Sequence, residues 1–141
     1  MIEFESAGDG AFLVSMRVRK ADAPHPRDAA LIRDLTLLFR VFNRRHFGDK
    51  LPEVPIRLTG RFHRTLANLR EVDTDPSIVW FVFSRQYVER ASSASIKDTL
   101  LHEMIHLWQH EQGQREYHNA LFRAKARELG VDPHACEGSE P

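Results

Sequence analysis

The first clear hydrophobic pattern in the chain is a stripe of apolar residues at helical spacing between residues 28 and 46. The apolar positions, which fall at i, i+4, i+7, i+8 and i+11, are Leu31, Leu35, Leu38, Phe39 and Phe42. Side chains at this spacing share one helical face, so the segment predicts an amphipathic helix that packs on a core. Asp28 is a candidate N-cap, and Gly48 followed by Pro52 is a stop signal after His46.

Alternation of apolar and polar residues predicts strands on both sides of this helix. Before it, residues 2–20 alternate around Gly8-Asp9-Gly10, which predicts a hairpin, and residues 21–26 have the composition of a linker. After it, three segments predict a small sheet, and Pro55 places the first of them at a sheet edge or a strand start. These segments are 54–59, 65–72 and 78–83, with a turn at 73–76.

The segment from Ser95 to His110 predicts a second long helix, which is apolar around much of its circumference. Ser95 is a candidate N-cap, and Asp98 at the third helical position fits a capping box. A helix this apolar is buried, so ionisable side chains on it need partners. A last helix is predicted from about residue 115 to 129, and residues 131–141 have the pattern of a frayed tail.

Length and composition fit one compact domain with a hydrophobic core. The chain has 141 residues, and its 20 basic and 20 acidic residues cancel, so net charge favours no particular partner. A single cysteine, Cys136, excludes an internal disulfide framework and a multi-cysteine zinc ribbon. The N-terminus does not have the pattern of a secretory signal, and no apolar run is long enough to span a membrane. We therefore expect a cytoplasmic protein, and association with a nucleoid or nucleus is compatible with this.

The candidate chemistry lies in the second long helix, in the sequence His102-Glu103-Met104-Ile105-His106. Two histidines four residues apart lie one turn apart on the same helical face. That geometry suits chelation of Zn²⁺, which imidazole nitrogens bind at about 2.0–2.1 Å. Glu103 follows the first of the two histidines and can lie beside a metal-bound water, as in zinc hydrolases with this H-E-x-x-H pattern. We predict His102 and His106 as metal ligands and Glu103 as the catalytic residue.

A catalytic zinc takes three protein ligands and keeps one position for water. His118 is the first choice, because it lies beyond a break at Gly113 and can approach from another direction. His110 is rotated by about 80° from His102 on a straight helix, which makes it a poor third ligand. The carboxylate alternatives are Glu111, Glu116 and Glu128, and Tyr117 or His110 could stabilise an oxyanion.

Several segments carry a family resemblance in a fixed order. They are Asn43–Pro52, Ile56–Leu58, Leu101–Leu107, His118–Phe122 and Arg127–Gly130. In these segments the chain resembles the SprT-like family of zinc metalloproteases, which includes the Spartan proteases. The resemblance implies that His102, His106 and His118 bind zinc and that Glu103 is catalytic. Asn119 stands where the family usually has glycine, and no zinc ribbon follows.

The resemblance also implies an α+β, zincin-like fold. Its elements are an N-terminal helix, a small β-sheet, the H-E-x-x-H active-site helix and a closing C-terminal helix. We accordingly predict an N-terminal extension at 1–27, the SprT-like domain at 28–132 and a flexible tail at 133–141. The predicted activity is zinc-dependent hydrolysis of peptide bonds, in which Glu103 is the general base.

Two alternatives from other functional classes stay open. One is a DNA-associated binding module with a structural zinc, and the other is a zinc hydrolase of a non-peptide bond. DNA binding is suggested by nine basic residues against three acidic ones in residues 33–70, and by the aromatic residues Phe62, Trp80 and Phe81. The arginines predicted to contact DNA are Arg40, Arg44, Arg45, Arg57, Arg61 and Arg64. Such contacts could bring DNA-associated substrate proteins to the site, or the 1–27 extension could instead cover it.

Overall fold

The computed structural model describes residues 25–114 and 118–132, and the architecture below concerns these residues. Four predictions therefore lie outside them: the hairpin in 2–20, the tail at 133–141, and any role of Glu116 or Tyr117. Cys136 lies outside them as well.

The first helix forms as predicted. A short 3-10 turn, η2 (Pro26–Asp28), leads into α3 (Ala29–His46). The buried face of α3 includes Ile32, Leu35, Phe39 and Phe42, while Leu31 and Leu38 pack at its margin. Asp28 is the N-cap residue as predicted, but its carboxylate makes no capping bond and accepts hydrogen bonds from Arg85 instead.

Three strands form the sheet, which has the order β1-β3-β2. They are β1 (Ile56–Thr59), β2 (Ala67–Val72) and β3 (Asp75–Ser84). β1 runs parallel to β3 with Ile56 opposite Phe81, and β2 runs antiparallel to β3 with Leu69 opposite Phe81. Pro55 precedes an edge strand as predicted. The turn is shorter than predicted, since β3 already begins at Asp75.

The helices after the sheet differ from the prediction mainly at their ends. A short helix that was not predicted, α4 (Arg85–Arg90), connects β3 to α5 (Ser93–Glu111). The N-cap of α5 is Ser92, not Ser95, because the Ser92 hydroxyl accepts the Ser95 N–H at 3.1 Å. The Ser95 hydroxyl instead lies 2.6 Å from the Tyr87 hydroxyl.

The last helix, α6 (Ala120–Leu129), begins later than the predicted residue 115. Asn119 is its N-cap, and Gly130 ends it in the left-handed conformation. The predicted tail is wrong at Val131, which is buried and donates its backbone N–H to the Ala126 carbonyl.

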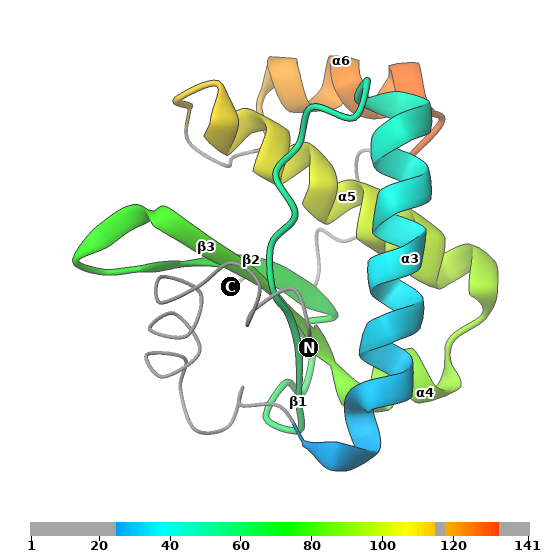
Figure 1. Ribbon diagram of the computed structural model, residues 1–141. Helices are drawn as coiled ribbons and strands as arrows, with labels where there is room; N and C mark the ends of the chain where they lie inside the picture. Colours follow the sequence, from blue (N-terminus) through cyan, green and yellow to red (C-terminus); the bar gives the residue numbers. More distant parts are fainter. Residues whose placement is uncertain (1–24, 115–117, 133–141) are drawn as a thin grey trace.

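The main core lies between the helices and one face of the sheet. Figure 1 shows α3 and α5 crossing over that face, with α6 stacked against α5. Val79, Phe81 and Phe83 of β3 belong to this core, whereas Trp80 and Val82 belong to a second cluster. Alternate residues of a strand point to opposite faces, so β3 is buried on both sides. The observed fold is α+β, as predicted. Among the described helices, none is long and apolar enough to cross a membrane.

Candidate metal centre

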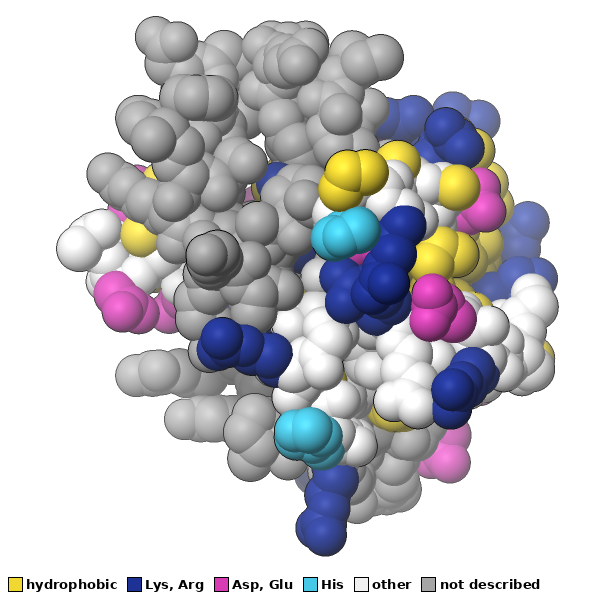
Figure 2. All heavy atoms as spheres, turned by 90° about the horizontal axis from the view of Figure 1, so that it is seen from below, with side chains coloured by type: hydrophobic (Ala, Val, Ile, Leu, Met, Phe, Trp, Pro, Cys, Tyr) yellow, Lys and Arg dark blue, Asp and Glu magenta, His cyan; other side chains and the backbone are white. Residues whose placement is uncertain are grey.

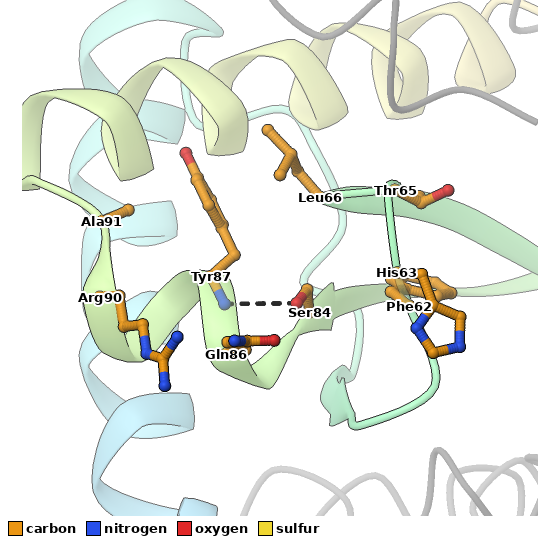
Figure 3. A pocket seen from close by; sticks show the side chains of 9 residues that line it. All are labelled: Phe62, His63, Thr65, Leu66, Ser84, Gln86, Tyr87, Arg90 and Ala91. Atoms are coloured by element: carbon orange, nitrogen blue, oxygen red, sulfur yellow. Dashed lines mark hydrogen bonds between the residues drawn. The ribbon is translucent and has the colours of Figure 1, made fainter.

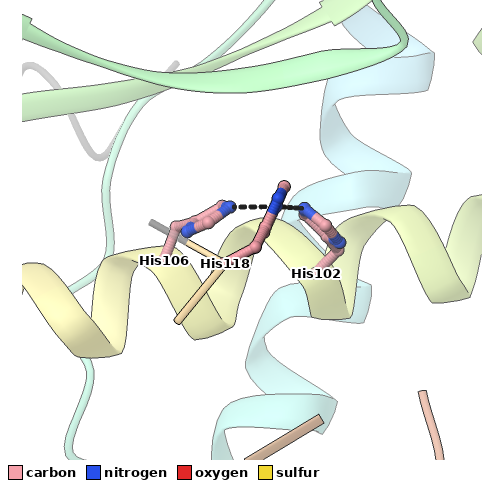
Figure 4. Close-up of side chains that lie close together, drawn as sticks. All are labelled: His102, His106 and His118. Atoms are coloured by element: carbon pink, nitrogen blue, oxygen red, sulfur yellow. Dashed lines mark hydrogen bonds between the residues drawn. The ribbon is translucent and has the colours of Figure 1, made fainter. Parts of the chain in front are cut away.

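The central helix α5 carries two of the predicted ligands on one face. His102 and His106 are 0% and 3% exposed, and their ring centroids lie 4.9 Å apart. Their burial follows from the sequence, because apolar residues surround them and place this part of α5 inside the core. Figure 4 shows both rings rising from α5 on the side that faces the sheet.

His118 reaches the same point from the segment just before α6. Its Nε2 lies 3.0 Å from Nε2 of His102 and 3.2 Å from Nε2 of His106. The Phe122 ring, one turn into α6, packs against all three imidazoles with centroids 4.7–4.8 Å apart. The three rings therefore have an apolar support on one side and converge on one point (Figure 4).

The donor set fits a tetrahedral metal ion. Zinc–imidazole bonds of about 2.0–2.1 Å at tetrahedral angles separate two ligand nitrogens by about 3.3 Å. The measured separations of 3.0 and 3.2 Å are close to this value. All three potential ligand atoms lie within 4.8 Å of one another, and three converging imidazoles could hold a metal ion.

Glu103 is buried beside this group. Its side chain is 1% exposed, and it follows His102 directly on α5. A carboxylate so far from solvent is costly to keep charged without partners. Glu103 thus adds a buried acid–base group to the same turn of α5 as His102.

The other predicted ligands lie elsewhere. His110 Nε2 is 2.9 Å from the Pro76 carbonyl oxygen, and the ring also approaches Glu71 and Glu111. Glu128 binds Lys125 at 3.0 Å on α6. The described residues thus bring His118, rather than His110, Glu111 or Glu128, to the first two histidines.

Gln109 and Asn119 contact the site and were not predicted to take part in it. Gln109 is fully buried, and its Oε1 lies 3.0 Å from Nδ1 of His106. Asn119 lies one residue after His118 and binds the other end of the Gln109 amide at 3.2 Å. The i, i+3 spacing of His106 and Gln109 was the available signal, because it places both side chains on one helical face.

A separate hollow of about 510 Å³ lies between the β1–β2 connection and α4. Figure 3 shows Phe62, Leu66 and Tyr87 at its walls, with His63 and Arg90 near its rim. The Tyr87 hydroxyl binds Thr99 at 2.7 Å, one turn before His102 on α5. None of the three histidines is among the described residues that line this hollow.

The basic residues predicted to bind DNA do not form one surface. Arg44 and Arg45 are in the last turn of α3, whereas Arg61 and Arg64 follow β1. The end of β1 lies near the start of α3, because Arg85 contacts both Asp28 and the Leu58 carbonyl. The two pairs therefore lie toward opposite ends of α3, an 18-residue helix about 27 Å long. On the face shown in Figure 2, basic side chains likewise occur in several separate places.

Three of the residues predicted to contact DNA are buried, so the prediction is wrong for them. Arg57 is 0% exposed, and desolvation lowers its pKa to about 10. Trp80 and Phe81 are 4% and 0% exposed. None of these side chains can contact a nucleic acid on the surface of this fold.

An α+β domain whose central helix carries H-E-x-x-H, with a third histidine brought in by the segment just before the closing helix, has the architecture of a zincin. Comparison with protein families agrees with this class, since the model of the SprT-like family matches residues 35–139. The chain belongs to the SprT-like family. Searches of curated proteins and of solved structures found no significant match.

Proposed function

We propose that the chain is a zinc-dependent metallopeptidase. The observation that carries this proposal is the convergence of three imidazole nitrogens, from the buried His102 and His106 and the partly buried His118, with Glu103 buried directly after His102 on α5. His102, His106 and His118 would hold the metal ion. Zinc, when bound, supplies Lewis acidity: it lowers the pKa of a coordinated water to about 7 and polarises a carbonyl oxygen.

Glu103 would carry the proton transfers of the reaction. Its carboxylate would take a proton from the attacking water as the water oxygen bonds to the carbonyl carbon. It would then give that proton to the amide nitrogen as the C–N bond breaks, which releases a carboxylate and an amine. Placement on α5 keeps the carboxylate fixed relative to His102 and His106. Phe122 helps to exclude water from the far side of the three rings.

The first experiment measures bound metal. Purified protein should contain about one zinc per chain, the stoichiometry of a single three-histidine site. His118→Ala should lose most of this zinc, because two histidines of one helix remain. His110→Ala is the matched control, since His110 faces Pro76 and should leave metal content unchanged. Equal zinc in wild type and His118→Ala would contradict the ligand set.

The second experiment separates hydrolysis from metal binding. Glu103→Gln preserves the size of the side chain and removes the base, so peptidase activity should fall about 10²–10⁴-fold while zinc stays bound. Full activity in this variant would refute the proposed base.

A panel of protein, small amide and phosphodiester substrates distinguishes a peptidase from a zinc hydrolase of another bond. A DNA-associated module with a structural zinc would hydrolyse none of them.

A further inference from the structure

Three hydrogen bonds link His106, one of the two candidate ligands on α5, to the start of α6. His106 Nδ1 lies 3.0 Å from Gln109 Oε1, and Gln109 Nε2 lies 3.2 Å from Asn119 Oδ1. The Phe122 backbone N–H completes the series, 3.0 Å from the same Asn119 oxygen. Gln109 is 0% exposed, so its amide lies in the interior where these bonds are not exchanged with water.

The direction of each bond follows from the backbone end of the series. An N–H of the main chain can only donate, so the Asn119 atom facing Phe122 is the oxygen. The Gln109 atom facing that oxygen must also donate, which identifies it as the amide nitrogen. The amide oxygen of Gln109 therefore faces His106 and accepts, so His106 Nδ1 carries the proton.

A neutral imidazole with its proton on Nδ1 has a lone pair on Nε2, which can bind a metal ion. In His106 this is the atom that lies 3.2 Å from Nε2 of His118, at the point where the three rings converge. We propose that Gln109 and Asn119 are positioning residues that hold His106 in its metal-binding tautomer and orientation. This inference rests on the proposed metal site, and it assigns a role to Asn119, the departure from the family pattern.

The same residues also couple the two segments that supply ligands. Asn119 directly follows His118 and caps α6, so the cap that starts the helix also orients the Gln109 amide. Arg123 adds a second restraint, since its Nη1 donates to the His118 carbonyl. His106 on α5 and His118 before α6 are thus held in fixed positions relative to each other by shared hydrogen bonds.

The decisive test is the protonation pattern of His106 in metal-free protein, read from the ¹⁵N shifts of its ring at a pH where the ring is neutral. Wild type should show the proton on Nδ1. Gln109→Met removes the acceptor and should give a mixture of tautomers. Gln112→Met is the matched control: Gln112 is exposed on the next turn and should leave the His106 signals unchanged.

Metal affinity supplies a second readout. Gln109→Met should weaken zinc binding about 10–100-fold, the usual effect of losing a partner of a metal ligand. Asn119→Asp keeps both acceptor bonds and should bind zinc within a few-fold of wild type. Asn119→Gly still provides an adequate N-cap. It lacks the oxygen that orients Gln109, however, and should weaken zinc binding.

Two results would overturn the inference. One is a wild-type His106 with its proton on Nε2, and the other is a Gln109→Met variant with unchanged tautomer and zinc affinity. The tautomer measurement needs neither metal nor substrate. Absence of zinc or peptidase activity would therefore count against the proposed function, while the ¹⁵N pattern alone decides the role of Gln109.

Discussion

His46 shows how one side chain near the core responds to its surroundings. Partial burial lowers its pKa, and the positive charges of Arg45 and Lys125 lower it further. It lies at the end of α3, where its ring packs 5.8 Å from the ring of Phe42. This histidine is separate from the three that converge between α5 and the sheet.

We predict that His46 makes the metal-free protein less stable in mild acid. The folded state binds this proton less tightly than the unfolded chain. Its contribution is therefore complete above the unfolded pKa of about 6.5 and is lost as pH falls through that value toward the folded pKa. Urea unfolding at pH 8 and pH 5 should show a smaller loss of stability in His46→Gln than in wild type. Equal losses would contradict the assignment.

Single residues were predictable where chemistry and periodicity coincide. His102, Glu103 and His106 stand out because their spacing suits a metal on a helix, and His118 because it follows a break. Gln109 was missed because no sequence motif marks an amide side chain that supports a metal ligand. Its role also depends on a tertiary contact with Asn119, which the sequence does not reveal. Arg57 was misjudged because a short strand does not show from sequence which of its faces is covered.

At the scale of elements, the start of α5 depends on Ser92. We predict that Ser92→Ala costs about 1 kcal/mol of unfolding free energy, because the Ser95 N–H loses its acceptor. Ser93→Ala is the control, since Ser93 is exposed at the first helical position and its removal should cost less than about 0.5 kcal/mol. Chemical denaturation of the three proteins measures the difference, and equal stabilities would rule out this cap.

The pairing of Asp28 with Arg85 joins the start of α3 to the start of α4. Two hydrogen bonds of 2.8 and 2.7 Å connect them, and the Asp28 side chain is 1% exposed. We predict that Asp28→Ala costs about 3–5 kcal/mol, because it leaves the Arg85 guanidinium without its counter-ion in a largely buried site.

The exposed pair Arg40–Glu53 provides the control for this prediction. It has the same 2.7 Å separation, but its side chains are 45% and 36% exposed. Arg40→Ala should cost only about 0–1 kcal/mol, because water screens the charges and replaces the bonds. Thermal or urea unfolding measures the loss of stability in Asp28→Ala and in Arg40→Ala. Equal losses would show that burial does not determine how much each ion pair contributes.

Element identity was predictable from periodicity, and element ends were not. The apolar stripe on α3 fits only a helix with one buried face, and the apolar run in β3 fits a strand buried on both faces. Both elements therefore occur where they were predicted. Helix starts depend on which of several serines or acids finds a backbone N–H, and tertiary contacts decided this. The Ser95 hydroxyl binds Tyr87, and Ser92 caps α5 in its place. Asp28 is at the N-cap of α3, but its carboxylate binds Arg85 and makes no capping bond.

At the scale of the whole molecule, four of the exposed arginines predicted to contact DNA form two separate pairs, while Arg40 is paired with Glu53. We propose that both the Arg44–Arg45 and the Arg61–Arg64 pair contact DNA. Reversing either pair to Glu should reduce the slope of log affinity against log salt by about 1.8, the value for two phosphate contacts. Binding titrations over a range of salt concentrations measure this. Unchanged slopes in both double variants would show that neither pair contacts DNA.

We further predict that DNA stimulates cleavage at low salt and that the effect fades as salt increases. The charge-reversed variants should lose this stimulation and retain zinc. The alternative is that residues 1–27 restrain the enzyme. In that case DNA would leave the rate unchanged, and deletion of residues 1–27 would raise it.

The three histidines come from two separate segments of the chain, and this links metal binding to the stability of the folded protein. Only the folded chain brings His118 to His102 and His106, so a zinc ion held by all three would favour that state over the unfolded chain. At free zinc 100 times the dissociation constant, this linkage would add about 2.7 kcal/mol to folding. The supply of zinc in the surroundings would then set how long each copy resists degradation, as well as whether it is active. Starvation for the metal would lower the amount of the protein.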